Sequence, residues 1–201
     1  MALTIAAGLA MLAYLAGAIP FSFLVARARG VDLRVVGSGN VGASNVWRNC
    51  GFGAFLVALA GDMLKGALPV AVAQALGLAP LAVIAVGAAA MLGHTRSIFL
   101  GFRGGKAVAT GGGVLLALAP LIALTGLVCW GIVFGATRIA AVASLSAAMA
   151  CAIVAGVMFL LGALPLASAL FVWVAAVVIV ALHRANIRRL RSGTENRFDK
   201  L

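Results

Sequence analysis

The sequence predicts an all-α integral membrane protein, a polytopic bundle of seven transmembrane helices joined by short loops. Of its 201 residues, 65% are hydrophobic and 9% are charged, a balance that is not typical of water-soluble domains. The apolar residues also form runs close to the length of about 20 residues that a helix needs to cross a bilayer. Because there is no long polar linker and no internal repeat, we expect a single membrane domain over residues 1–201.

The first three apolar runs are separated by one charged loop and one uncharged turn. Ala2 to Ala26 is followed directly by Arg27 and Arg29, with no Lys or Arg before it, which argues against a signal peptide. This charge distribution also predicts that the N-terminus lies outside the cytoplasm. The second run extends from Phe52 to about Leu76 and the third from Leu78 to Leu92.

The apolar stretch from Val108 to Ala136 predicts two short spans, with Pro120 near its middle. Lys106 and Arg138 should lie on the same positive face of the membrane, which requires an even number of crossings between them. The sequence leaves the ends of these two spans between residues 107 and 137 open. The last two runs are Ile139 to Leu161 and Leu166 to Leu182, joined by an uncharged turn.

All the charged loops therefore lie on one face, which the positive-inside rule makes the cytoplasmic face of a bacterial inner membrane. The net charge of +11 does not indicate nucleic acid, because the basic residues are not interleaved with aromatic residues that stack on bases. Membrane lipids with anionic head groups and phosphorylated substrates are the expected partners. The sequence has no marker of oligomeric state, and we expect the protein to work as a monomer.

Candidate metal ligands and general bases are few. The two histidines and three scattered cysteines give no ligand cluster, so we expect no metal and no cofactor. A two-metal phosphotransferase site needs several converging carboxylates, and the whole chain contains four acids: Asp32, Asp62, Glu195 and Asp199. The His and Asp pair of thioester-dependent acyltransferases, spaced five residues apart, is also absent, since Phe99 and Arg188 stand at the Asp positions.

The first charged loop contains GSGNVGASNVWR, residues 37–48. Its glycines and small hydrogen-bond donors are typical of an oxyanion nest, to which Arg48 would add a positive charge. The alternative is a turn of Ser, Asn and Gly that caps the next helix.

The second charged segment is GHTRSIFLGFRGGKAVATGGG, residues 93–113. Gly104 and Gly105 allow positive φ and close approach to an anion, Lys106 adds a charge, and Thr110 adds a hydroxyl. The spacing is not that of a nucleotide P-loop. The alternative is a turn between two membrane helices. Arg96 is a further candidate to bind an anion.

The tail HRANIRRLRSGTE brings His183 and Asn186 close to one face if the last helix continues beyond the lipid. Its arginines are typical of a juxtamembrane cluster on anionic lipid. Asp62 and Lys65 lie three residues apart within the second apolar run. They are either a structural ion pair or a substrate-orienting pair.

The site is rich in groups that bind anions and poor in general bases. It therefore suits a reaction in which the acyl donor is already activated, such as an acyl phosphate. The protein then has to align the substrates and stabilise charge.

The charged segments resemble the motifs of the bacterial acyl-phosphate:glycerol-3-phosphate acyltransferases. The matching stretches are GSGNVGASN with Arg48, GHTRSIFLGFRGGKAVAT, HRANIRRLRSGTE, and Asp62 with Lys65 and Gly66. The resemblance implies seven spans, a cytoplasmic active site, no thioester donor and no metal. Two positions depart from the usual pattern. Ser44 replaces a Thr, and Ala107 replaces a Gly and removes backbone freedom from the turn.

By this resemblance the protein transfers a fatty acyl group from acyl phosphate to the 1-hydroxyl of sn-glycerol 3-phosphate, giving 1-acylglycerol 3-phosphate and phosphate for phospholipid biosynthesis. The implied catalytic residues are Ser38, Arg48, Lys106, His183 and Asn186. The implied substrate-binding residues are Gly37, Asn40, Asn45, Arg96, Gly104, Gly105, Thr110 and Glu195, with Asp62 and Lys65 in support.

We expect direct attack of the hydroxyl, with a phosphate oxygen or His183 taking the proton, rather than an acyl-Ser38 intermediate. The alternative function is a transporter or channel for a phosphorylated solute, which predicts cations on both faces or at the midplane. A non-catalytic lipid-anchoring protein would leave the loops without a purpose. Acyl chain length is not readable from the sequence.

Overall fold

The computed structural model describes residues 1–198, and every regular element in that range is a helix. The chain divides into two compact units, Met1–Leu118 and Ala119–Leu201. The helices of the first unit are α1 (Ala2–Ala18), α2 (Phe21–Arg27), α3 (Ala43–Cys50), α4 (Phe52–Ala75), α5 (Pro80–Thr95), the short 3-10 helix η1 (Ile98–Leu100) and α6 (Val108–Leu118). Those of the second are α7 (Pro120–Thr137), α8 (Ala140–Leu160), α9 (Leu166–Leu182) and α10 (Arg184–Arg191).

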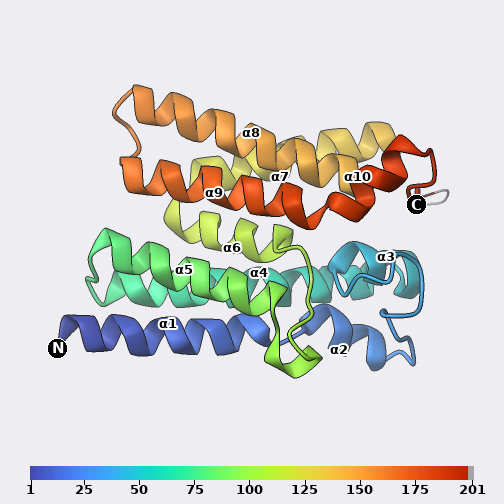
Figure 1. Ribbon diagram of the computed structural model, residues 1–201, viewed down its shortest axis with the longest axis horizontal. Helices are drawn as coiled ribbons and strands as arrows, with labels where there is room; N and C mark the ends of the chain where they lie inside the picture. Colours follow the sequence, from blue (N-terminus) through green and yellow to red (C-terminus); the bar gives the residue numbers. More distant parts are fainter. Residues whose placement is uncertain (199–201) are drawn as a thin grey trace. The chain divides into compact units, whose positions relative to one another are not determined.

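Glycines bring the helices of the first unit into close backbone contact. Helices α1 and α5 lie side by side (Figure 1), and a Cβ on Gly17 would overlap the carbonyl of Ala90. Helices α4 and α6 pack in the same way, because a Cβ on Gly113 would overlap the carbonyl of Met63. Small residues at such positions allow the van der Waals packing on which helix association in a membrane depends.

The charged loop between α2 and α3 has a small hydrophobic core of its own. Leu33 from the loop and Val46 from α3 are fully buried, together with Ala26 of α2 and Ala58 of α4. The ring of Trp47 stacks on Phe55 with 4.7 Å between ring centroids. These contacts hold the loop and the short helix α3 against the end of α4.

In the second unit, α8 packs against both α7 and α9 (Figure 1). Trp130 Nε1 of α7 donates to Ser144 Oγ of α8 at 3.1 Å, and Trp173 Nε1 of α9 donates to the carbonyl of Ala152 at 3.0 Å. After α10 the chain returns to α7, where the ring of Phe198 meets Phe134 edge to face at 5.2 Å.

The structure confirms a multi-pass arrangement of apolar helices, with boundaries near those predicted. Among residues 1–198, five stretches are long and apolar enough to cross a membrane, and α9 with α10 makes a sixth if the pair is counted across its 56° bend. The predicted division of residues 108–136 into two helices is confirmed, with Pro120 at the start of α7. With 11 residues, α6 is only about 16 Å long, which is half of a hydrocarbon core.

Candidate active site

Asn45 organises the first charged loop. It lies on α3 and is 2% exposed. Its Nδ2 donates to the backbone carbonyls of Leu33, Val36 and Asn40 at 3.1 to 3.2 Å, and its Oδ1 accepts the N–H of Ser38 at 3.2 Å. The N–H and oxygen groups of this amide are therefore hydrogen-bonded within the protein. This favours a structural role in addition to the predicted role in substrate binding.

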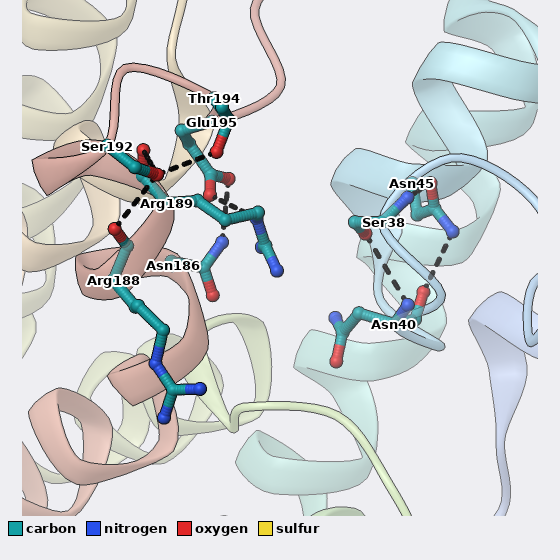
Figure 2. A network of polar contacts seen from close by, with 9 residues as sticks. All are labelled: Ser38, Asn40, Asn45, Asn186, Arg188, Arg189, Ser192, Thr194 and Glu195. Carbon is teal, nitrogen blue, oxygen red and sulfur yellow. Dashed lines mark hydrogen bonds and ion pairs between the residues drawn. The ribbon is translucent and has the colours of Figure 1, made fainter.

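The oxyanion nest predicted for this loop does not form from the three N–H groups that follow Gly37. Gly37 and Gly39 do have positive φ, 58° and 68°. However, the N–H of Ser38 donates to Asn45, that of Gly39 to a loop carbonyl at 3.0 Å, and that of Asn40 to Ser38 Oγ at 3.4 Å. Figure 2 shows the bonds that link Ser38, Asn40 and Asn45, with the Asn40 side chain pointing away from the other two. The nest prediction is wrong for these groups because the protein's own oxygens already accept their hydrogen bonds.

Charge in this loop is partly neutralised by Asp32. Its carboxylate accepts two side-chain hydrogen bonds from Arg34 and lies 3.8 Å from Arg27 Nη1. The hydrogen bonds from Arg34 lower the pKa of Asp32 to about 2. The carboxylate stays ionised down to that pH and keeps this arginine paired. Arg48, three residues after Asn45 on α3, is half-buried.

Gly104 and Gly105 pack on the C-terminal end of α5, and neither has a positive φ. The N–H of Gly105 donates to the carbonyl of His94 at 3.1 Å, and a Cβ on Gly104 would overlap that same carbonyl oxygen. The positive φ that glycine allows is therefore not used at these two positions, and their close approach to an anion stays a prediction. Close approach to α5 is what requires glycine here. The left-handed residues of this segment are Gly101, Phe102 and Ala107, the last with φ of 57°.

Because Ala107 is left-handed and fully buried, we expect Ala107→Gly to retain activity and Ala107→Val to lose it. Glycine adopts this φ freely, which removes about 1–2 kcal/mol of backbone strain. This relief offsets the backbone entropy cost of glycine and the loss of the methyl group. Valine is β-branched and has no space there. Melting temperature and turnover of both variants in detergent test this prediction, and a stable, active valine variant would contradict it.

The other predicted residues of this segment differ in exposure. Lys106 is half-buried and lies directly before Ala107 and the first turn of α6, where the helix dipole favours an anion. Arg96 is exposed. Thr110 is 0% exposed, and its Oγ1 has no hydrogen bond to any described residue. Its contact with a substrate phosphate stays a prediction.

Asp62 and Lys65 form an ion pair inside the first unit. Lys65 Nζ lies 2.7 Å from Asp62 Oδ1 and also donates to the carbonyl of Ile19 at 2.7 Å. The other oxygen of Asp62 accepts a hydrogen bond from Ser22 at 2.6 Å. Sequence reasoning found the pair from its spacing but missed Ser22, because no local pattern brings residue 22 to residue 62. It also missed His94, whose Nδ1 lies 3.7 Å from Asp62 Oδ1.

His183 stands where the last helix bends by 56° between α9 and α10, so the helix does not run straight on as the sequence reading required. The histidine is 3% exposed, and its Nδ1 lies 2.8 Å from the carbonyl of Ile179. A carbonyl oxygen can only accept, so Nδ1 carries a proton, and in the neutral imidazole the lone pair is then on Nε2. This tautomer suits a proton acceptor.

Glu195 joins Asn186 to Arg189 in the second unit (Figure 2). Its Oε1 accepts from Asn186 Nδ2 and its Oε2 from Arg189 Nε, both at 2.7 Å. The carboxylate side chain is 6% exposed, and Asn186 is 4% exposed. The structure thus pairs Glu195 with a cation and shows that it also holds the amide of Asn186.

We expect Glu195→Ala to lower kcat/KM about tenfold or more and to destabilise the protein by about 2 kcal/mol, because Asn186 and Arg189 lose their acceptor. Glu195→Gln should retain part of both, since an amide oxygen can still accept one bond. Turnover and thermal unfolding of the two variants test this ordering. Equal activity of the alanine variant and the unchanged protein would show that Asn186 does not need the carboxylate.

The predicted residues thus group within each unit. In the first unit, Ser38, Asn40 and Asn45 form one network, Gly104 and Gly105 contact α5, and Asp62 pairs with Lys65. In the second unit, Asn186 and Glu195 are bonded directly.

Comparison with known proteins finds close similarity over nearly the whole chain. The family model "Glycerol-3-phosphate acyltransferase" matches residues 7–193. A protein named glycerol-3-phosphate acyltransferase from Roseiflexus sp. (strain RS-1) is 72% identical, covering 96% of this chain and 95% of the relative. One of the same name from Geobacter sulfurreducens is 47% identical, covering 94% and 96%. The crystal structure of PlsY, "an integral membrane glycerol 3-phosphate acyltransferase", in its glycerol 3-phosphate form, is 38% identical with a TM-score of 0.88, covering 96% of this chain and 95% of that one.

Proposed function

The chain belongs to the glycerol-3-phosphate acyltransferase family, and we propose that it transfers a fatty acyl group from an acyl phosphate to the 1-hydroxyl of sn-glycerol 3-phosphate. The products are 1-acylglycerol 3-phosphate, a phospholipid precursor, and inorganic phosphate. The observation that carries this proposal is the family match over residues 7–193. That range takes in the first two charged segments and the third as far as Gly193. We assign both units to one acyltransferase domain because the match covers both.

The choice of donor follows from the chemistry of the site residues. An acyl phosphate is a mixed anhydride whose phosphate leaves readily, so attack by a hydroxyl needs alignment and charge stabilisation more than a strong base. In the step, the 1-hydroxyl oxygen bonds to the acyl carbon, the bond from that carbon to the phosphate oxygen breaks, and the proton ends on the released phosphate. No metal or cofactor takes part in this proposal.

The phosphate groups of the two substrates are assigned to the cations of the first unit. Lys106 stands beside the first turn of α6, where its charge and the helix dipole favour the same anion. Arg48 and Arg96 are the further candidates, and Ser38 contributes a half-buried hydroxyl. Asn45 contributes by holding the loop that contains Ser38.

His183 is the protein group proposed to take the proton of the hydroxyl before it passes to phosphate. The bond between its Nδ1 and the carbonyl of Ile179 supports this role, because it leaves the lone pair on Nε2. Asn186, held by Glu195, is assigned to the same reaction.

We further propose seven membrane crossings, with the charged loops on the cytoplasmic face of a bacterial inner membrane. The cations of residues 27–48, 96–106 and 184–197 support this orientation, because the turns before Pro80 and before Leu166 carry no charge. The N-terminus then lies on the opposite face and the C-terminus on the cytoplasmic face. We propose that one chain suffices for turnover.

The proposal is tested by phosphate release from purified protein in detergent, given palmitoyl phosphate with and without glycerol 3-phosphate. Phosphate release should require glycerol 3-phosphate, and palmitoyl-CoA should not replace the acyl phosphate, which release of free CoA thiol measures. In Lys106→Ala we expect kcat/KM to fall about a hundredfold, because the variant lacks the positive charge that binds a substrate phosphate. Folded protein that releases neither phosphate from palmitoyl phosphate nor CoA thiol from palmitoyl-CoA would contradict the proposal and point to transport, which flux into liposomes would measure.

A further inference from the structure

A buried carboxylate is held in place between three elements of the first unit. Asp62 of α4 is 1% exposed, and its two oxygens are bound separately by Lys65 Nζ at 2.7 Å and by Ser22 Oγ of α2 at 2.6 Å. Lys65 is fixed in turn by the carbonyl of Ile19, at the break between α1 and α2. A carboxylate whose two oxygens are both bound, in a site of low dielectric, can reorient only at a high cost in free energy.

His94, near the end of α5, is the next group in this cluster. It is 8% exposed, and its Nδ1 lies 3.7 Å from Asp62 Oδ1. Nδ1 is enclosed and has no hydrogen bond to any described residue, and the Asp62 carboxylate is the acidic group that faces it, within ion-pair range but beyond hydrogen-bonding distance. An enclosed N–H that makes no hydrogen bond is most favourable when it faces a negative charge. We conclude that Asp62 sets the orientation of the imidazole.

The opposite edge of the imidazole contacts the glycine-rich loop. A Cβ on Gly105 would overlap His94 Nε2 and would lie 2.9 Å from His94 Cε1. The N–H of Gly105 also donates to the backbone carbonyl of His94 at 3.1 Å. His94 therefore contacts Gly105 through both its ring and its backbone, and Lys106 is the next residue in the chain.

We propose that His94 is a positioning residue, which transfers the fixed position of the Asp62 carboxylate to Gly105 and so determines where Lys106 presents its charge. This inference rests on the proposed function, in which Lys106 binds a substrate phosphate. It gives the Asp62 and Lys65 pair a role in the site without direct contact with substrate. It also explains why position 105 has no side chain, since a methyl group would occupy the place of the ring.

The first test is His94→Asn, with KM measured for glycerol 3-phosphate and for palmitoyl phosphate, each at saturation of the other. The shorter amide retains an N–H toward Asp62 but lacks the ring edge against Gly105. We expect one of the two KM values to rise about tenfold with kcat changed less than about threefold, since ground-state and transition-state binding weaken together. A merely structural role would reduce the amount of folded enzyme and leave both KM values unchanged, which would overturn the proposal.

The second test does not depend on turnover. Gly105→Ala alone should lower the melting temperature by several degrees. In the His94→Asn variant the same substitution should lower it by less than half as much, because the ring that the new methyl group would meet is absent. In the same double variant the raised KM should return toward that of the unchanged protein, as the methyl group takes the place of the ring. Additive losses of stability would overturn the proposal. Gly112→Ala, where the added Cβ meets nothing within 4 Å, is the control and should be additive with His94→Asn.

A milder variant covers the case in which Gly105→Ala does not fold. Ser22→Ala removes one of the two groups that hold Asp62, and we expect it to raise the same KM about threefold. Unchanged KM values in both Ser22→Ala and His94→Asn would overturn the inference. If the unchanged protein itself shows no turnover, the proposed function fails, and the stability cycle still decides whether His94 positions Gly105.

Discussion

Replacing Gly104 by alanine is expected to lower kcat/KM at least about a hundredfold, because displacement of a substrate-positioning group by about 1 Å can have that effect. The new Cβ would overlap the carbonyl oxygen of His94 and lie 2.9 Å from the carbonyl carbon of Thr95. Both are backbone atoms at the end of a helix, so they cannot move aside as a flexible side chain would. The loop that contains Lys106 has to move instead.

Gly112→Ala is the matched control for this change. Gly112 lies inside α6, eight residues further along, and a Cβ there meets nothing within 4 Å. Alanine is the better helix former by about 1 kcal/mol, so this variant should be as stable as the unchanged protein or more stable. Phosphate release and thermal unfolding in detergent compare the two. Full activity in Gly104→Ala would show that the loop does not have to contact α5.

Replacing Asn45 by leucine should destabilise the protein by at least about 3 kcal/mol, since each buried polar group left without a partner costs about 1–3 kcal/mol. Leucine has a similar volume but neither donates nor accepts. The carbonyls of Leu33, Val36 and Asn40 and the N–H of Ser38 would all lose the partner that the amide provides. Because Ser38 lies in this loop, activity should be lost as well.

Asn49→Ala is the control for the leucine variant. Asn49 is one turn further along α3, is exposed, and donates to the backbone carbonyl of Asn45 at 2.9 Å and to its Oδ1 at 3.0 Å. Its removal should change stability by less than about 1 kcal/mol. Denaturant unfolding of both variants, followed by tryptophan fluorescence, measures the difference. Equal effects at the two positions would mean that Asn45 does not organise the loop.

Local patterns were sufficient for the parts of this protein that depend on neighbouring residues. The apolar runs predict most helix boundaries to within a few residues, and Leu166–Leu182 is found as predicted. Pro120 begins a new helix because proline has no N–H to donate to the preceding turn. The pair of Asp62 and Lys65 also follows from spacing, since residues three apart on a helix are neighbours.

The polar segments show where such patterns reach their limit. The glycines and small hydrogen-bonding side chains of residues 37–45 indicate an irregular, hydrogen-bonded loop. They do not indicate which groups accept its hydrogen bonds. The accepting group for Ser38 is the amide of Asn45, seven residues away, so the donors that look available for an anion are already used. Gly104 and Gly105 were singled out for a phosphate site, which stays a prediction, whereas their packing against the end of α5 is visible only in the folded structure.

The sequence alone determined that this chain is a multi-pass helical membrane protein, that its polar chemistry lies in three segments, and which family it resembles. Composition, charge and motif spacing are local properties, and they are present before the chain folds. Only the tertiary structure decided that Asn45 holds a loop, that Glu195 binds both Asn186 and Arg189, and that His94 lies between Asp62 and Gly105. These roles depend on which groups meet when distant segments pack, and on which hydrogen bonds the folded chain has already formed.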